Sequence, residues 1–237
     1  MTARSVVLSV LLGAHPAFAS AAELVRLTAD FGIRESTLRV ALTRMVGVGD
    51  LVRSADGYRL SDRLLARQRR QDEAIRPESA AWSGYWHMVI VTSVGADARD
   101  RAALRNAMHD KRFSELREGV WMRPDNIELS LQPELRERVR VLRARDEASV
   151  QLAGELWDLP GWAAEGDRLL DEMAAATDTP GRFMAAAAMV RHLVTDPTLP
   201  AELLPADWPG DRLRAAYHEF AAELIRRRET TQLAEVP

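Results

Sequence analysis

The chain has 237 residues, 47% of them hydrophobic, and no apolar run approaches the roughly 20 residues of a membrane-spanning helix, so the composition excludes disordered and membrane-spanning proteins. It lacks cysteine, which excludes a disulfide scaffold, a thiolate metal site and a cysteine nucleophile. The net charge is −3, but residues 1–76 hold 12 arginines against 8 acidic residues, so a basic N-terminal part precedes an acidic remainder, which favours nucleic-acid contact through the N-terminal part.

The first twenty residues allow two interpretations. The apolar residues of 6–11 predict a helix that covers the inner face of a DNA-binding head, and His15-Pro16 would end it. Together with Arg4 and the Ala-x-Ala tripeptide at 17–19, the same apolar stretch also resembles a secretory signal. An exported helical binding protein therefore stays open as an alternative.

Residues Ser20 to Leu60 predict two helices, a sharp turn and a β-hairpin in that order. Ser20 and Glu23 form a capping box, in which each side chain satisfies an orphan backbone N–H at the start of the first helix. Gly32 follows that helix, and glycine readily adopts the positive φ that turns the chain. This order predicts a winged helix-turn-helix DNA-binding domain over residues 1–60.

The second of these helices starts near Arg34 and has two unlike sides. At 100° per residue, its apolar side is formed by Leu38, Ala41, Leu42 and Met45. The opposite side carries hydroxyl groups and Arg39, which can bond guanine edges or phosphate. This side predicts a recognition helix, although the solvent face of any amphipathic helix carries the same residue types.

The hairpin is predicted over 50–54 and 58–60, with Asp56-Gly57 supplying the positive φ values of a two-residue turn. One arginine lies on each arm of the hairpin. The predicted DNA contacts are therefore the polar side of the recognition helix and these two arginines: Arg34, Ser36, Thr37, Arg39, Val40, Thr43, Arg44, Arg53 and Arg59.

Residues 61–80 are predicted to be a helical connector. The stretch 61–76 has few apolar positions and five arginines, and Pro77 ends it. A solvated surface helix is the simpler interpretation. The arginines at 63, 67 and 70 lie at helical spacing and could instead contact the DNA backbone.

Residues 81–146 predict a ferredoxin-like βαββαβ domain. A β-branched run at 87–92 predicts a central strand, and 98–110 has helical periodicity. Two further strands are expected at 119–123 and 126–131, joined by Pro124-Asp125. A short helix at 132–137 and a strand at 138–144 complete the order.

Residues 147–237 predict a helical domain. Its four helices are expected at 150–159, 162–173, 181–195 and 211–228, with a proline-rich loop at 196–205 between the last two. The fold class is therefore α+β, with a winged helix-turn-helix, a ferredoxin-like domain and a C-terminal helical domain.

Several segments resemble those of the PaaX family of transcriptional repressors of phenylacetic-acid catabolism. They are FGIRESTLRVALTRMVGVGDL, the Trp-x-Gly-x-Trp motif at 82–86, LWDLPGW, and HLVTDPTLPAELLPADWPG followed by a helix with Tyr217 and Phe220. The resemblance covers nearly the whole chain. It implies a cytoplasmic homodimer that binds double-stranded operator DNA, has no membrane partner, and is released by a CoA thioester such as phenylacetyl-CoA.

The effector site cannot be located from spacing, but aromatic and arginine side chains suit an aryl group and CoA phosphates. The candidate residues are Trp82, Trp86, Arg112, Trp121 and Arg123. Core packing and surface ion pairs are the simpler roles for them.

Competing chemistries lack a motif. The five histidines have no metal-ligand spacing beyond His192 and Asp196 at i,i+4, and no phosphate-binding loop or nucleophile elbow occurs. A metal-dependent ferredoxin-like nuclease would need a carboxylate at the end of the first strand, where the chain has Thr92-Ser93. We therefore expect no enzyme activity, no metal and no cofactor. The ferredoxin-like nuclease stays open as a second alternative.

Overall fold

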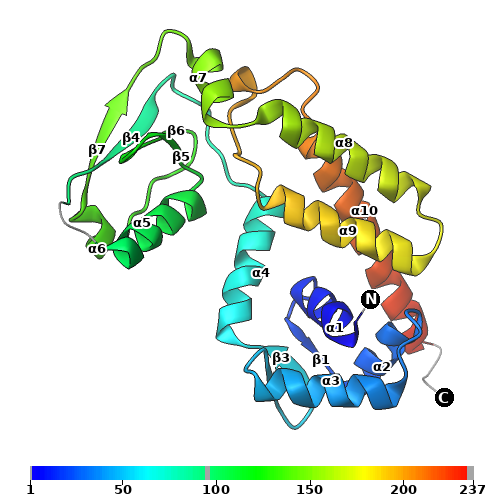
Figure 1. Cartoon of the computed structure of the whole chain (residues 1–237). Helices are drawn as coiled ribbons and strands as arrows, with labels where there is room; N and C mark the ends of the chain where they lie inside the picture. The colour runs from blue at the N-terminus through cyan, green and yellow to red at the C-terminus, as the bar shows by residue number, and fades with distance from the viewer. Residues whose placement is uncertain (1, 94–96, 234–237) are drawn as a thin grey trace. The chain divides into compact units, whose positions relative to one another are not determined.

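The structure is a computed structural model that describes residues 2–93 and 97–233, with the backbone alone for residues 227–233. The chain divides into two compact units (Figure 1). The first consists of Met1–Arg76, Gly166–Val194 and Gly210–Pro237, and the second of Pro77–Glu165 and Thr195–Pro209. These units cut across the predicted C-terminal helical domain, because most of its helices belong to the first unit together with the N-terminal head.

The head consists of three helices and a small sheet: α1 (Ala3–Leu12), β1 (Phe18–Ala19), α2 (Ala21–Ala29), α3 (Glu35–Gly47), β2 (Leu51–Arg53) and β3 (Tyr58–Leu60). Val7, Leu11 and Leu24 are fully buried in its core. The capping box is confirmed, since Ser20 Oγ accepts the Glu23 N–H at 3.1 Å and Glu23 Oε2 accepts the Ser20 N–H at 3.2 Å. The positive φ of Gly32, +66°, is confirmed as well.

The hairpin turn differs from the prediction. Strand β3 lies between β2 and the short strand β1, and both pairings are antiparallel. The expected positive φ at Asp56-Gly57 is wrong, because neither residue has one. Glycine is needed at 57 for a close approach instead: a Cβ there would lie 2.4 Å from the Ala19 carbonyl oxygen and 2.9 Å from Ser20 Cα.

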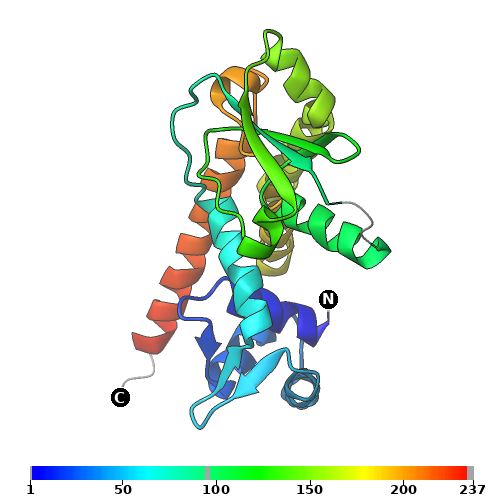
Figure 2. The same cartoon turned by 90° about the vertical axis from the view of Figure 1, so that its left-hand side faces the viewer.

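Four further helices belong wholly or largely to the first unit: α4 (Asp62–Ile75), α8 (Leu159–Ala175), α9 (Thr179–Leu193) and α10 (Gly210–Leu233). Figure 2 shows α4 leaving the sheet of the head. The α4 residue Gln68 is buried, and its amide donates to the carbonyls of Leu11, Leu12 and Ala14 at 2.8–3.3 Å. Because these carbonyls lie at the end of α1 and just beyond it, Gln68 caps α1 and fixes α4 to the head.

The second unit contains a four-stranded sheet. Its elements follow the predicted order: β4 (Trp86–Val91), α5 (Ala98–Asp110), β5 (Ser114–Arg117), β6 (Val120–Pro124), α6 (Pro133–Arg136) and β7 (Val139–Ala144). The strands lie in the order β5-β6-β4-β7, and every neighbouring pair is antiparallel. One face packs on α5, and the other packs on α7 (Ser149–Leu156) and the 3-10 helix η1 (Ala201–Leu203).

The strand predicted at 126–131 is wrong, and strand β5 was missed. The hairpin partner of β6 precedes it in the chain, and the turn between them uses Gly119 at φ +77°. The backbone after Pro124 forms a loop that is held by a side chain. The buried Arg123 guanidinium donates to the Ile127 carbonyl in this loop at 3.0 Å and to the Lys111 carbonyl before β5 at 2.9 Å. Ile127 thus bonds to a side chain rather than to a neighbouring strand.

Within the described part of the chain, no helix combines the length and the apolar character needed to cross a bilayer.

Candidate nucleic-acid interface

The orientation of α3 is fixed by its apolar side. Leu38, Leu42 and Met45 are at most 2% exposed and belong to the core of the head. With 3.6 residues per turn, burial of this side leaves the opposite side of α3 in solvent. All nine side chains predicted to contact DNA are exposed: Arg34, Ser36, Thr37, Arg39, Val40, Thr43, Arg44, Arg53 and Arg59.

Two groups on the exposed side of α3 already have partners within the helix. The Arg39 guanidinium forms an ion pair with Glu35, one turn earlier, and both side chains are largely exposed. An exposed pair of this kind contributes little stability, so Arg39 can exchange Glu35 for a base edge or a phosphate at small cost. The Thr43 hydroxyl donates to the Arg39 carbonyl oxygen at 3.0 Å, which leaves its methyl group and its lone pairs for a ligand.

A groove of about 620 Å³ separates the exposed side of α3 from the start of α1. Ser36, Thr37, Val40 and Arg44 line it from α3, and Arg4 lines it from α1. The structure thus brings four of the predicted residues to one surface. It adds Arg4, which the sequence analysis considered only as part of a possible secretory signal.

Arg4 is held in place by a buried carboxylate. Asp50, 1% exposed, accepts hydrogen bonds from Arg4 Nε at 3.0 Å and Arg4 Nη2 at 2.8 Å. Its second oxygen accepts Nη2 of Arg63 on α4 at 2.5 Å. Both arginines remain more than half exposed, so Asp50 positions two cations at the surface of the head.

The two hairpin arginines do not lie on one face. Arg53 is paired with Tyr58 across the strands, whereas Arg59 is paired with Val52. Because side chains on a strand alternate between the two faces, Arg53 and Arg59 point to opposite faces of the hairpin. A single DNA backbone passing along one face would therefore meet only one of them.

The residues predicted for effector binding are not brought together. Trp86 and Trp121 are at most 1% exposed and lie in the two different cores on opposite faces of the sheet. Trp82 packs edge-on against Trp86 with the ring centroids 6.3 Å apart, and its indole N–H donates to the Tyr85 carbonyl oxygen at 2.7 Å. The three indoles therefore do not converge on one site in this conformation.

The two arginines of the predicted effector site have structural partners. Arg112 donates to the backbone carbonyl of Asp196. Arg123 is 4% exposed, and burial, followed by the positive charge of Arg112, lowers the pKa of Arg123 to about 10. Arg123 is therefore still charged at neutral pH, and it holds the loop after β6 through the carbonyl bonds described above.

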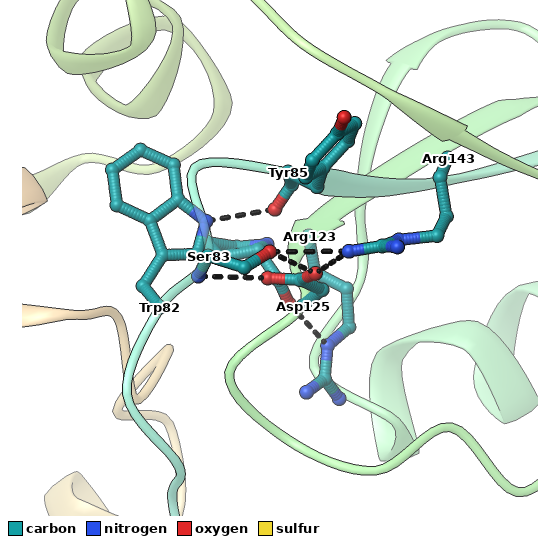
Figure 3. Close-up of polar contacts among 7 residues, drawn as sticks. Trp82, Ser83, Tyr85, Arg123, Asp125 and Arg143 are labelled. Carbon is teal, nitrogen blue, oxygen red and sulfur yellow. Dashed lines mark hydrogen bonds and ion pairs between the residues drawn. The ribbon is translucent and has the colours of Figure 1, made fainter.

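A polar cluster missed by the sequence analysis lies beside this loop (Figure 3). The Asp125 carboxylate accepts the Ser83 hydroxyl at 2.6 Å and Arg143 Nη2 at 2.7 Å. The guanidinium groups of Arg143 and Arg145 each lie 4.2 Å from the centroid of the Tyr85 ring. The cluster ties the segment before β4 to β6 and β7. The Trp-x-Gly-x-Trp motif at 82–86 marks this segment in the sequence. It does not indicate that Asp125, Arg143 and Arg145 are its partners.

The cluster perturbs two titratable groups. Burial alone would raise the pKa of Asp125, but the hydrogen bonds from Ser83 and Arg143 outweigh burial and lower it. Burial and then the charge of Arg123 lower the pKa of the His87 imidazole, with Asp125 acting in the opposite direction and Arg143 adding to the lowering. Among the residues that the structure describes, no group of three or more His, Cys, Asp and Glu is placed to hold a metal ion.

Comparison with known proteins gives a consistent result. Three family models match consecutive parts of the chain: "PaaX-like protein" over residues 2–64, "PaaX protein central Cas2-like domain" over 79–152 and "PaaX-like protein C-terminal domain" over 161–232. The transcriptional repressor PaaX of Escherichia coli (strain K12) is 28% identical over 224 residues, which cover 81% of this chain and 69% of that protein.

Among solved structures, the uncharacterized protein Rv0674 from Mycobacterium tuberculosis is 74% identical and superposes with a TM-score of 0.86. The match covers 98% of this chain and 99% of that chain.

The matches to the PaaX-like family model and to a transcriptional repressor place the protein in the class of non-enzymatic transcription regulators. Within that class, the chain belongs to the PaaX family of transcriptional repressors.

Proposed function

We propose that this repressor binds double-stranded operator DNA through residues 1–60, acting as a winged helix-turn-helix with α3 as its recognition helix. One observation carries the proposal: the side of α3 opposite the buried Leu38, Leu42 and Met45 exposes hydroxyl, arginine and valine side chains together. These groups match the guanine, phosphate and thymine-methyl surfaces of a major groove.

The remaining parts are assigned as follows in this proposal. Residues 61–80 act as the connector, 81–146 as a ferredoxin-like domain, and 147–237 as the C-terminal helical part. The strand order β5-β6-β4-β7, together with α5 between β4 and β5 in the chain, supports the ferredoxin-like assignment. We propose a homodimer that works in the cytoplasm without a membrane partner, following the resemblance to PaaX.

The proposed effector is a CoA thioester with an aromatic acyl group, such as phenylacetyl-CoA, again from the resemblance. An effector releases DNA only if it binds the DNA-incompetent state more tightly than the competent one. Of the five candidate residues, Trp82 and Arg112 are partly exposed, so they can meet such a ligand without repacking of a core. A role for Trp86, Trp121 or Arg123 requires that the second unit change its packing.

Recovery of bound fragments from genomic DNA tests the proposal, since a repressor enriches a small set of sites that share one sequence. Enrichment without a common sequence, or cleavage of DNA with Mg²⁺ or Mn²⁺, would contradict it. Titration of a recovered operator with phenylacetyl-CoA, other acyl-CoA esters and free phenylacetate tests the effector separately. We expect the thioester to lower operator affinity by about 5–150-fold. If none of these compounds changes the affinity, the proposed effector is wrong.

A further inference from the structure

The first unit contains an apolar cavity, partly open to solvent, that the proposed function does not use. Its volume is about 160 Å³, and five helices line it: α1 and α2 of the head, α4, α9 and α10. Every lining residue belongs to the first unit. The cavity therefore lies where the head packs on α4, α9 and α10.

Aromatic rings form part of its wall. Phe183 on α9 meets Phe31 edge-on with centroids 5.0 Å apart, and meets Phe220 on α10 edge-on at 6.2 Å. Both Phe183 and Phe220 are 6% exposed. Ala187 and Ala221 also line the cavity, and their short side chains leave its space open. Edge-to-face contact is a preferred arrangement for a further aromatic ring among these phenylalanines.

The volume limits the ligand to one ring. An apolar cavity of about 150 Å³ accepts benzene, whereas pockets for drug-sized ligands measure roughly 300–1,000 Å³. A CoA thioester is far larger than this cavity, so a ligand of this size differs from the effector proposed above. An unfilled apolar cavity is destabilising, because its lining atoms lack contacts on one side. A ring that fills it would therefore stabilise the folded protein.

Charged side chains lie where the cavity meets solvent. Arg67 on α4 and Arg191 on α9 line it and are exposed, and neither forms an ion pair with any residue that the structure describes. Asp30 is the acidic lining residue, also exposed, and Tyr217 adds a phenol whose pKa is raised by burial and then by Asp72, so it stays protonated. Two arginines against one carboxylate favour an anionic group on the ligand.

We propose that this cavity binds a single-ring aromatic carboxylate, with the ring among Phe31, Phe183 and Phe220 and the carboxylate at Arg67 or Arg191. Such a ligand contacts Leu27 of α2 and Phe31, and only residues 32–34 separate Phe31 from the first residue of α3. The site therefore connects α9 and α10 to α3, the helix to which the proposed function assigns DNA binding.

Binding can be tested on the full-length protein without DNA or CoA, so its failure is separate from failure of the proposed function. The probes are 3-(4-fluorophenyl)propanoate, whose flexible arm lets the carboxylate reach either arginine, and neutral fluorobenzene. Fluorine NMR linewidths give the affinity of each probe. We expect both probes to bind, and the carboxylate to bind more tightly.

Ala187→Leu, which fills the cavity, should weaken both probes by at least about tenfold. The matched control is Ala188→Leu, the next residue of α9, which is equally half-buried but does not line the cavity and should leave binding unchanged. The double variant Arg67→Gln/Arg191→Gln should weaken the propanoate about tenfold and leave fluorobenzene unchanged.

Equal binding to Ala187→Leu and the wild type would overturn the proposal, as would no binding of either probe up to about 10 mM. If Ala187→Leu does not fold, nuclear Overhauser contacts between the probe ring and labelled alanine methyl groups of the wild type locate the binding site instead. Contacts to Ala187 and Ala221 support the site. Contacts confined to alanines of the second unit contradict it.

Discussion

Asp50 shows how one residue can organise the surface of the head. Its carboxylate is buried, yet both of its arginine partners, Arg4 and Arg63, extend into solvent. The ion pairs therefore connect three separate parts of the head and α4. Arg4 lies in the first turn of α1, Asp50 lies between α3 and β2, and Arg63 lies in the first turn of α4. A buried carboxylate needs such partners, because an unpaired charge in the core is very costly.

Asp50→Asn removes the charge and keeps the shape of the side chain. We expect the head to lose about 1.5–3 kcal/mol of stability, the range for hydrogen bonds to charged groups. Urea unfolding followed by far-UV circular dichroism measures this loss. All six tryptophans lie in the second unit, so the tryptophan fluorescence transition should stay in place. The exposed Asp56→Asn is the control, and an equal loss there would refute the role of Asp50.

His87 makes the stability of the second unit depend on pH. Its pKa is lowered in the folded state, so the unfolded chain takes up a proton near pH 6.5 before the folded protein does. The contribution of His87 to stability is therefore present above about pH 6.5 and is lost as the pH falls toward the folded-state pKa. Asp125, whose pKa is also lowered, acts in a separate window below about pH 4.

We therefore expect tryptophan-detected unfolding of the wild type to require less urea as the pH falls below about 6.5. His87→Gln should flatten this dependence between about pH 6.5 and 4 and leave the decline below about pH 4. An unchanged slope in His87→Gln between those values would show that another group titrates there.

Among the secondary-structure elements, the hairpin depends on close packing at Gly57. Gly57→Ala would place a methyl group against the backbone of β1, and we expect a loss of about 1–3 kcal/mol, as for an overpacked core. Gly47→Ala at the end of α3 is the matched control, because nothing lies within 4 Å of its Cβ position. It should be neutral or stabilise by up to about 1 kcal/mol. Hydrogen exchange of β3 amides distinguishes the two variants.

The helices could be predicted because their signals are local. The capping box of α2, the glycine that ends it and the apolar period of α3 are each contained within one or two turns. Helix α5 matches its predicted bounds, Ala98–Asp110. The strands were less predictable, because a strand needs a partner that can lie anywhere in the chain.

Two of the three errors in the strands, the unpredicted strand β1 and the strand expected at 126–131, have the same cause. Strand β1 has only two residues, and its partner β3 lies about forty positions away. The segment at 126–131 has the composition of a strand, but Arg123 takes up the carbonyl of Ile127 from within the core. Local periodicity does not report either of these contacts.

The exposed side of α3 could be predicted, since burial of one helix side determines the other. The partners of its residues could not. The ion pair of Arg4 with Asp50 spans 46 positions, and the separation of Trp86 from Trp121 depends on which face of the sheet each occupies. The grouping of α9 and α10 with the head likewise follows from packing between distant segments.

For the whole molecule, the proposed dimer determines the form of the operator. A closed two-fold dimer presents two identical heads, so we expect an inverted repeat with half-sites separated by about 10 base pairs or a multiple of that. Sedimentation at micromolar concentration tests the dimer, and footprinting of a recovered fragment tests the inverted repeat. A monomer that protects one half-site would contradict the dimer.

The central claim is that the exposed side of α3 reads the operator. Its most direct test is a fluorescence anisotropy titration of a recovered operator with the double variant Arg39→Ala/Arg44→Ala. The control Arg99→Ala/Arg117→Ala removes the same charge from exposed positions of the second unit. We predict that the α3 variant binds at least about tenfold more weakly than the wild type and that the control binds equally well. Wild-type affinity in the α3 variant, or an equal loss in the control, would contradict the claim.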